Sequence, residues 1–77
     1  MVKFKLIEIN GDIIHYEYYP EGDKEDKGIF IFNPAKEEII RHDRPKTYGN
    51  NYYGHFLNGI RDKETGGFKE KDIVAWY

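Results

Sequence analysis

The sequence contains neither cysteine nor serine, and these two absences remove several classes of chemistry. Without cysteine the chain can form no disulfide and offers no thiolate to a metal ion or to covalent catalysis. Its only aliphatic hydroxyl groups belong to Thr47 and Thr65. Most covalent mechanisms therefore lack a nucleophile, and we expect no catalytic residues. Acid–base chemistry between Asp43 and Glu17 is the one catalytic option left open, although the sequence gives no reason for these two residues to meet.

Long apolar runs and an excess of one charge are missing as well. The apolar positions near the N-terminus alternate with Lys3, Lys5 and Glu8, which is not the pattern of a signal peptide or a membrane span. The 12 basic and 14 acidic residues are interspersed and give a net charge of −2. Generic attraction to nucleic acid or to anionic lipid needs a basic excess. We therefore expect a cytoplasmic protein with no membrane partner, for which nucleic acid is an unlikely partner.

Aromatic residues are what the chain has in quantity. It has 77 residues, and among them are seven tyrosines, five phenylalanines and one tryptophan. A chain this short buries only about 60% of its unfolded surface, so its core must rely on large side chains. We expect a single domain that spans residues 1–77.

Hydrophobic periodicity predicts five strands. Alternating apolar and polar residues, the pattern of a half-buried strand, begin at Val2, and Asn10-Gly11 is a strong hairpin signal between two such runs. Ile7 and Ile9 fall out of phase with the start of the first strand. Either a bulge shifts the register near Ile7, or both faces are covered there. The predicted strands are residues 2–9, 13–19, 28–32, 38–42 and 73–77.

One segment, residues 50–63, has the period of a helix. Its apolar side chains recur three and four residues apart and share one flank. Asn50 or Asn51 is the expected N-cap, and Gly66-Gly67 is the expected stop. The apolar flank comprises Tyr52, Tyr53, Phe56, Leu57 and Ile60.

The order of elements predicts an α+β fold, ββββαβ. We expect a four- to five-stranded, mostly antiparallel sheet with the helix packed on one face. The third strand is apolar on both faces, which favours a central or well-covered position. Phe68 is expected to pack at the edge of the core. The helix is expected to cover the face formed by Val2, Phe4, Leu6, Ile14, Tyr16 and Tyr18.

Several short motifs resemble a group of small bacterial proteins of unknown function. The motifs are a YYPEG turn at residues 18–22, a Tyr-x-His helix at residues 53–55 with Ile60, and Phe68 followed by a terminal VAWY at residues 74–77. The resemblance implies a compact cytoplasmic domain with no assigned activity. It carries no functional residues over to this chain.

The aromatic surplus predicts an interaction surface, because a single helix covers only one face of a sheet. Large exposed apolar patches usually mark a binding site, and tyrosine and tryptophan are favoured at interfaces. We expect a non-catalytic module that binds a protein partner or a second copy of itself. A strongly curled sheet that wraps its own core is the open alternative. The candidate contact residues on the helix-free face are Ile13, His15, Tyr19, Phe30, Phe32 and Trp76.

Two other candidate sites each have a simpler interpretation. Arg41, Arg44, Lys46 and Tyr48 form one locally basic, aromatic stretch that could contact phosphates and stack a base, and weak nucleic-acid binding is the alternative function. His15 shares a strand face with Glu17, but two such residues are more often a solvated surface than a metal site. We therefore expect no metal and no cofactor.

Overall fold

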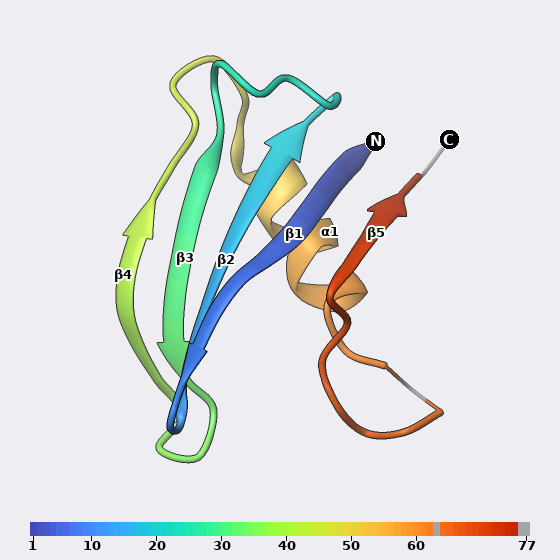
Figure 1. Ribbon diagram of the computed structural model, residues 1–77. Coiled ribbons are helices and arrows are strands. Elements are labelled where there is room, and N and C mark those ends of the chain that lie inside the picture. The colour runs from blue at the N-terminus through green and yellow to red at the C-terminus, as the bar shows by residue number, and fades with distance from the viewer. Residues whose placement is uncertain (63, 76–77) are drawn as a thin grey trace.

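A five-stranded antiparallel sheet with one helix across one face forms the domain (Figure 1). The computed structural model describes residues 1–62 and 64–75. In spatial order the sheet runs β4-β3-β2-β1-β5, which confirms the predicted α+β class and the element order ββββαβ. Within the described residues no helix combines the length and the apolar content needed to cross a membrane. The elements are β1 (Val2–Asn10), β2 (Ile13–Pro20), β3 (Gly28–Asn33), β4 (Glu38–Asp43), α1 (Asn50–Gly59) and β5 (Lys71–Val74).

The first hairpin follows the sequence prediction and settles its ambiguity. Gly11 has a φ of 62°, the left-handed conformation that a tight turn after Asn10 requires. A β-bulge lies between Leu6 and Glu8, where the pairing of β1 with β2 shifts by one residue. Ile7 and Ile9 are both exposed, so the alternative of a covered sheet on both sides is wrong.

The central strand is β2; β3, predicted to be central or well covered, lies beside it and has no exposed residue. β2 pairs with β1 on one side and β3 on the other, whereas β3 is one strand from the β4 edge. Ile29 and Ile31 of β3 remain half-exposed on the helix-free face. Neighbouring strands shield these two side chains in part, and no second layer of described structure covers them.

The helix is shorter than predicted. It covers Asn50–Gly59, and Gly49 occupies the N-cap position without any side-chain cap, so the prediction of Asn50 or Asn51 as the cap is wrong. The chain leaves the helix at Ile60 because the next segment folds back on it, with the Lys69 N–H donating to the Ile60 carbonyl at 2.8 Å.

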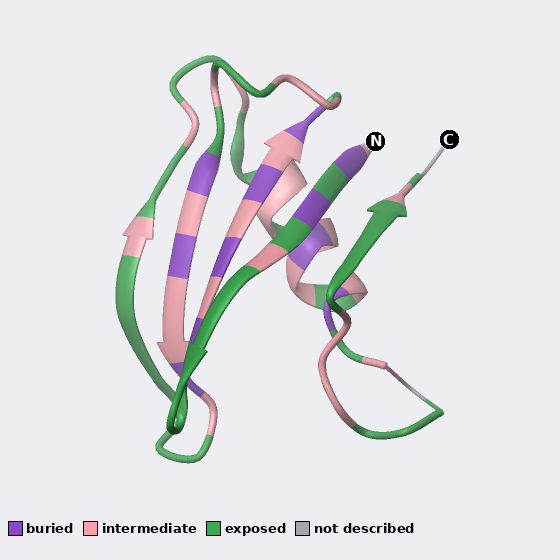
Figure 2. Cartoon of the chain, in the orientation of Figure 1, coloured by how far each residue is buried: buried purple, intermediate pink, exposed green. Residues whose placement is uncertain are grey.

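The predicted helix flank and the predicted sheet face form the core. Phe56 is fully buried, and its ring lies 4.6 Å from that of Tyr18, 5.7 Å from Tyr16 and 5.8 Å from Phe4. Aromatic pairs at these separations stabilise a fold beyond their buried area. Figure 2 shows α1 behind the upper part of β1 and β2, where both strands carry buried bands. The buried apolar residues are Val2, Phe4, Ile14, Tyr16, Tyr18, Phe30, Phe56 and Ile60.

The segment after the helix closes the edge of the core and returns to the sheet. Phe68 packs against Phe32 with ring centroids 5.5 Å apart, as predicted for a residue at the core edge. The Tyr16 hydroxyl donates to the Lys69 carbonyl at 2.6 Å. β5 then pairs antiparallel with β1 and begins two residues earlier than predicted. β5 ends at Val74, so Ala75 lies past the strand, contrary to the prediction, and Trp76 and Tyr77 lie outside the described residues.

Candidate functional site

The predicted aromatic contact residues divide between the two faces of the sheet. Ile13, His15 and Tyr19 lie on the helix-free face, as expected from their alternation with buried neighbours in β2. Phe30 is 2% exposed and Phe32 packs against the core, so both face the helix and their assignment to the free face is wrong. The cause is strand register: Phe30 pairs directly with Tyr16, a helix-facing residue. Trp76 cannot be placed because it lies outside the described residues.

The helix-free face is therefore a mixed surface, and among the described residues Tyr19 is the one tyrosine or phenylalanine of the predicted set that stays on it. One row across the strands reads Glu8, His15, Ile31 and Arg41. The next row reads Lys71, Lys5, Glu17, Ile29 and Asp43. Ile29 and Ile31 were not predicted here, because the run of four apolar residues in β3 fits either phase and only the pairing with β2 selects one.

The two carboxylates considered for acid–base chemistry share that second row but serve other partners. Glu17 accepts from Lys27 Nζ at 3.0 Å and from the Tyr19 hydroxyl at 2.8 Å. Burial alone would raise the pKa of Glu17, but these hydrogen bonds and the Lys27 charge outweigh it and lower the pKa. Asp43 is ion-paired with Arg41, and Ile29 separates it from Glu17. Each carboxylate is thus kept ionised by its own cation. A carboxylate with a lowered pKa is a weak base and does not suit general acid–base catalysis.

The histidines do not assemble a metal site in the described part of the chain. His15 Nε2 is shielded from solvent and makes no hydrogen bond to a described residue. His42 faces the core, where the Tyr18 hydroxyl lies 2.7 Å from Nε2 and the Tyr53 ring stacks at 4.0 Å. Burial, together with the Arg44 charge, lowers the pKa of His42. Among residues 1–62 and 64–75 there is no group of three metal-ligating side chains.

The basic stretch proposed for nucleic-acid contact lies against acidic residues. Arg41 is paired with Asp43, and the backbone N–H groups of Lys46 and Thr47 both donate to Asp26 at 2.7 Å. These contacts lower the pKa of Asp26 and keep it negative beside the stretch. The Tyr48 hydroxyl points to Asp23 at 3.5 Å. An approaching phosphate would meet carboxylates at each of these points, so the arrangement disfavours polyanion binding.

An exposed apolar surface occurs instead at the end of the sheet where the β1–β2 and β3–β4 hairpins turn. One row across four strands consists of Ile9, Ile14, Phe32 and Ile39, all on the side that carries the helix. Its outer members, Ile9 and Ile39, are 59% and 56% exposed. Both turns lie beyond α1 in Figure 1. We call this surface the isoleucine end; its exposed residues are Ile9 and Ile39, with Ile7 and Ile40 at the bulges of β1 and β4.

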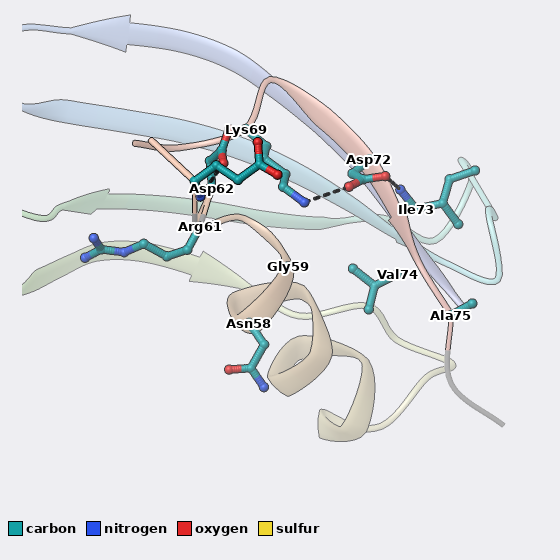
Figure 3. A pocket seen from close by; sticks show the side chains of 10 residues that line it. Asn58, Gly59, Arg61, Asp62, Lys69, Asp72, Ile73, Val74 and Ala75 are labelled. Carbon is teal, nitrogen blue, oxygen red and sulfur yellow. Dashed lines mark hydrogen bonds and ion pairs between the residues drawn. The ribbon is translucent and has the colours of Figure 1, made fainter. Parts of the chain in front are cut away.

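A polar cavity of about 650 Å³ lies between the end of α1 and β5 (Figure 3). Most of its charged groups are already engaged: Lys69 pairs with Asp72 at 2.9 Å, and Asp62 accepts the Glu64 backbone N–H at 3.0 Å. The Arg61 guanidinium lies 4.8 Å over the Phe68 ring, and Figure 3 shows its side chain extending away from the Lys69–Asp72 pair. This cavity therefore offers a ligand few free polar groups.

Comparison with known proteins adds no further guide to function. No protein-family model, curated protein or solved structure matches this chain at a significant level. The resemblance to small bacterial proteins, based on the motifs around Tyr18, Tyr53 and Phe68, stays a prediction. The exposure, contacts and charge of the chain's own residues are therefore the guide to its function.

Proposed function

We propose that this protein is a small, non-catalytic binding module that engages a protein partner, foremost a second copy of itself, through the isoleucine end. The observation that carries the proposal is the row Ile9, Ile14, Phe32 and Ile39, an apolar strip whose two ends are left in water. Scattered exposed apolar residues need no explanation, but a contiguous group of them marks an interaction surface. A cytoplasmic setting is part of the proposal, since the fold uses no disulfide.

The surface suits a symmetric complex better than edge-to-edge pairing of sheets. β4 is an edge strand, but it carries a bulge at Ile40 and the charges of Arg41 and Asp43, which are devices that discourage strand addition. Side-chain packing between two isoleucine ends meets no such obstacle.

The test is the oligomeric state as a function of concentration, measured by sedimentation equilibrium. We expect the natural chain to self-associate and the double variant Ile9→Thr/Ile39→Thr to remain monomeric, because two exposed apolar side chains are lost from the interface. Ile73→Thr is the matched control, since Ile73 is equally exposed at 55% but lies on β5, away from the hairpin turns. The control should associate as the natural chain does.

A monomer at millimolar concentration would contradict self-association. The partner would then be a different protein, and co-purification from the native source should retain it with Ile73→Thr and lose it with the double variant. Equal retention by both variants would contradict the proposal altogether. Weak nucleic-acid binding through Arg41, Arg44, Lys46 and Tyr48 is the alternative, and it requires oligonucleotide binding that weakens steeply with salt.

A further inference from the structure

We propose that a pocket on the helix-free face, on the β5 side of the sheet, binds a small organic phosphate. The pocket has a volume of about 520 Å³, within the range of sites for small molecules. We call it the lysine pocket. Its lining includes Lys3, Lys5, Lys24, Lys71, Tyr19 and Ile73.

Strand register gathers the lysines in one place. Lys3 and Lys5 alternate with buried residues in β1, so both point away from the helix. Lys71 of β5 pairs directly with Lys5, and Lys24 approaches from the loop after β2. Like charges directly opposite one another destabilise an antiparallel pair. The fold thus holds the ammonium groups of Lys5 and Lys71 on paired positions, and a bound anion would reduce the repulsion between them.

The carboxylates near the pocket already pair with other cations. Glu17, opposite Lys5, is bonded to Lys27, and Asp72 is bonded to Lys69 at 2.9 Å. Glu21 pairs with the N-terminal ammonium at 2.5 Å. None of the four pocket lysines forms an ion pair with any residue that the structure describes. The pocket therefore keeps a local positive charge in a chain whose net charge is −2.

An apolar floor adds selectivity to this charge. Lys3 pairs with Tyr19 on one side and with Ile73 on the other, so an aromatic ring and a branched side chain flank it. The Tyr19 hydroxyl is held by Glu17 at 2.8 Å, which fixes the ring. A flat ring stacks on tyrosine, and lysine ammonium groups bind phosphate as point charges. The combination fits a ligand with a ring at one end and a phosphate at the other.

A small ligand fits the charge distribution better than a polymer does. A nucleic acid would extend beyond the pocket toward Glu17, Asp43 and the acidic loop at residues 21–26, which repel phosphates. A mononucleotide needs only the local cluster. The pocket does not include any residue of the isoleucine end. A negative result for nucleotide binding would therefore leave the proposed function unaffected, and a negative result for self-association would leave the pocket unaffected.

Backbone amide chemical shifts of the full chain, titrated at constant ionic strength, provide the test. Adenosine monophosphate is the probe, and adenosine and inorganic phosphate are run separately. We expect shifts at Lys5, Gly22 and Lys71, and an affinity for the nucleotide at least about tenfold above that for either half, the equivalent of roughly 1.4 kcal/mol. Equal affinity for all three compounds, or shifts centred on Arg41 and Tyr48, would overturn the proposal.

Charge-removing variants make the test specific. Lys5→Gln and Lys71→Gln should each weaken nucleotide binding by about three- to tenfold, since each removes one close charge from the phosphate. Lys36→Gln is the control, because Lys36 is an exposed lysine in the β3–β4 turn, far from the pocket. Unchanged binding in both pocket variants, or an equal loss in the control, would contradict the assignment. Single-stranded oligothymidylate should bind no more tightly than the mononucleotide affinity multiplied by its number of nucleotides. A higher affinity would overturn the small-ligand assignment in favour of a polymer.

Discussion

The two ends of the same sheet show what the helix contributes. Near the start of β1 the aromatic side chains pack against α1 and are buried, whereas around the hairpin turns equally apolar side chains stay in water. Length is the cause. A nine-residue strand such as β1 extends about 30 Å, but a ten-residue helix such as α1 extends only about 15 Å. One helix of this size leaves about half of the strand length uncovered.

The difference separates residues that hold the fold from residues available to a partner. Ile14 and Ile9 are direct neighbours in one row, yet Ile14 belongs to the buried core and Ile9 does not. Burial, and not residue type, therefore determines which isoleucines stabilise the domain. The comparison predicts large stability effects at the covered end and small ones at the isoleucine end.

The largest loss is expected from Phe56→Ala. Phe56 is fully buried, and its ring packs against those of Phe4, Tyr16, Tyr18 and Phe30. Truncating a buried phenylalanine typically costs about 3–5 kcal/mol, which can exceed what a domain of this size has to spare. Urea denaturation followed by circular dichroism measures the loss. A change below about 1 kcal/mol would show that α1 does not organise the core.

A smaller loss is expected from Gly28→Ala at the start of β3. An added Cβ would lie 2.1 Å from the Tyr18 ring, so the ring or the strand must shift. Overpacking of this kind costs about 1–3 kcal/mol. Gly54→Ala is the control: nothing lies within 4 Å of that position, and the helix should gain up to about 1 kcal/mol. The two alanine variants should thus shift the thermal midpoint in opposite directions.

Removing the Tyr16 hydroxyl tests how the segment after the helix is held. In Tyr16→Phe the bond to the Lys69 carbonyl is lost, and we expect unfolding to become easier by about 1 kcal/mol. Amide hydrogen exchange should accelerate most at Lys69, whose N–H bonds to Ile60. Tyr48→Phe removes only a 3.5 Å contact at the surface and should leave the stability unchanged. Equal effects of the two variants would contradict a structural role for the buried hydroxyl.

The smallest effect is expected at the isoleucine end. Ile39→Thr should change the free energy of unfolding of the monomer by no more than about 0.5 kcal/mol, because the side chain is already in water. Ile14→Thr, in the same row, should cost at least about 1 kcal/mol, since it leaves a gap and buries a hydroxyl. Measurement in dilute solution keeps association out of the comparison. Similar losses in both variants would mean that the isoleucine end is part of the folding core.

Local sequence patterns predicted much of the fold, whereas the residues of the site depended on how the strands pair. Alternation from Val2 to Tyr19 and the Asn10-Gly11 turn predicted the first hairpin, including the bulge as one of two options. The run of apolar residues in β3 has no phase of its own, so Phe30 was assigned to the wrong face. The extent of the helix was also misjudged. Its apolar period continues to Ile60, but the chain leaves the helix there, where the Ile60 carbonyl accepts a hydrogen bond from Lys69, nine positions away.

The sequence by itself determined that this chain forms an antiparallel sheet with an aromatic core under one helix, because periodicity and turn chemistry act between near neighbours. Only the tertiary structure decided which side chains remain uncovered. The isoleucine end exists because α1 is shorter than the strands that it crosses. The lysine pocket exists because β5 pairs with β1 in a register that sets Lys71 against Lys5. Both depend on contacts between residues far apart in the sequence, and no local pattern encodes them.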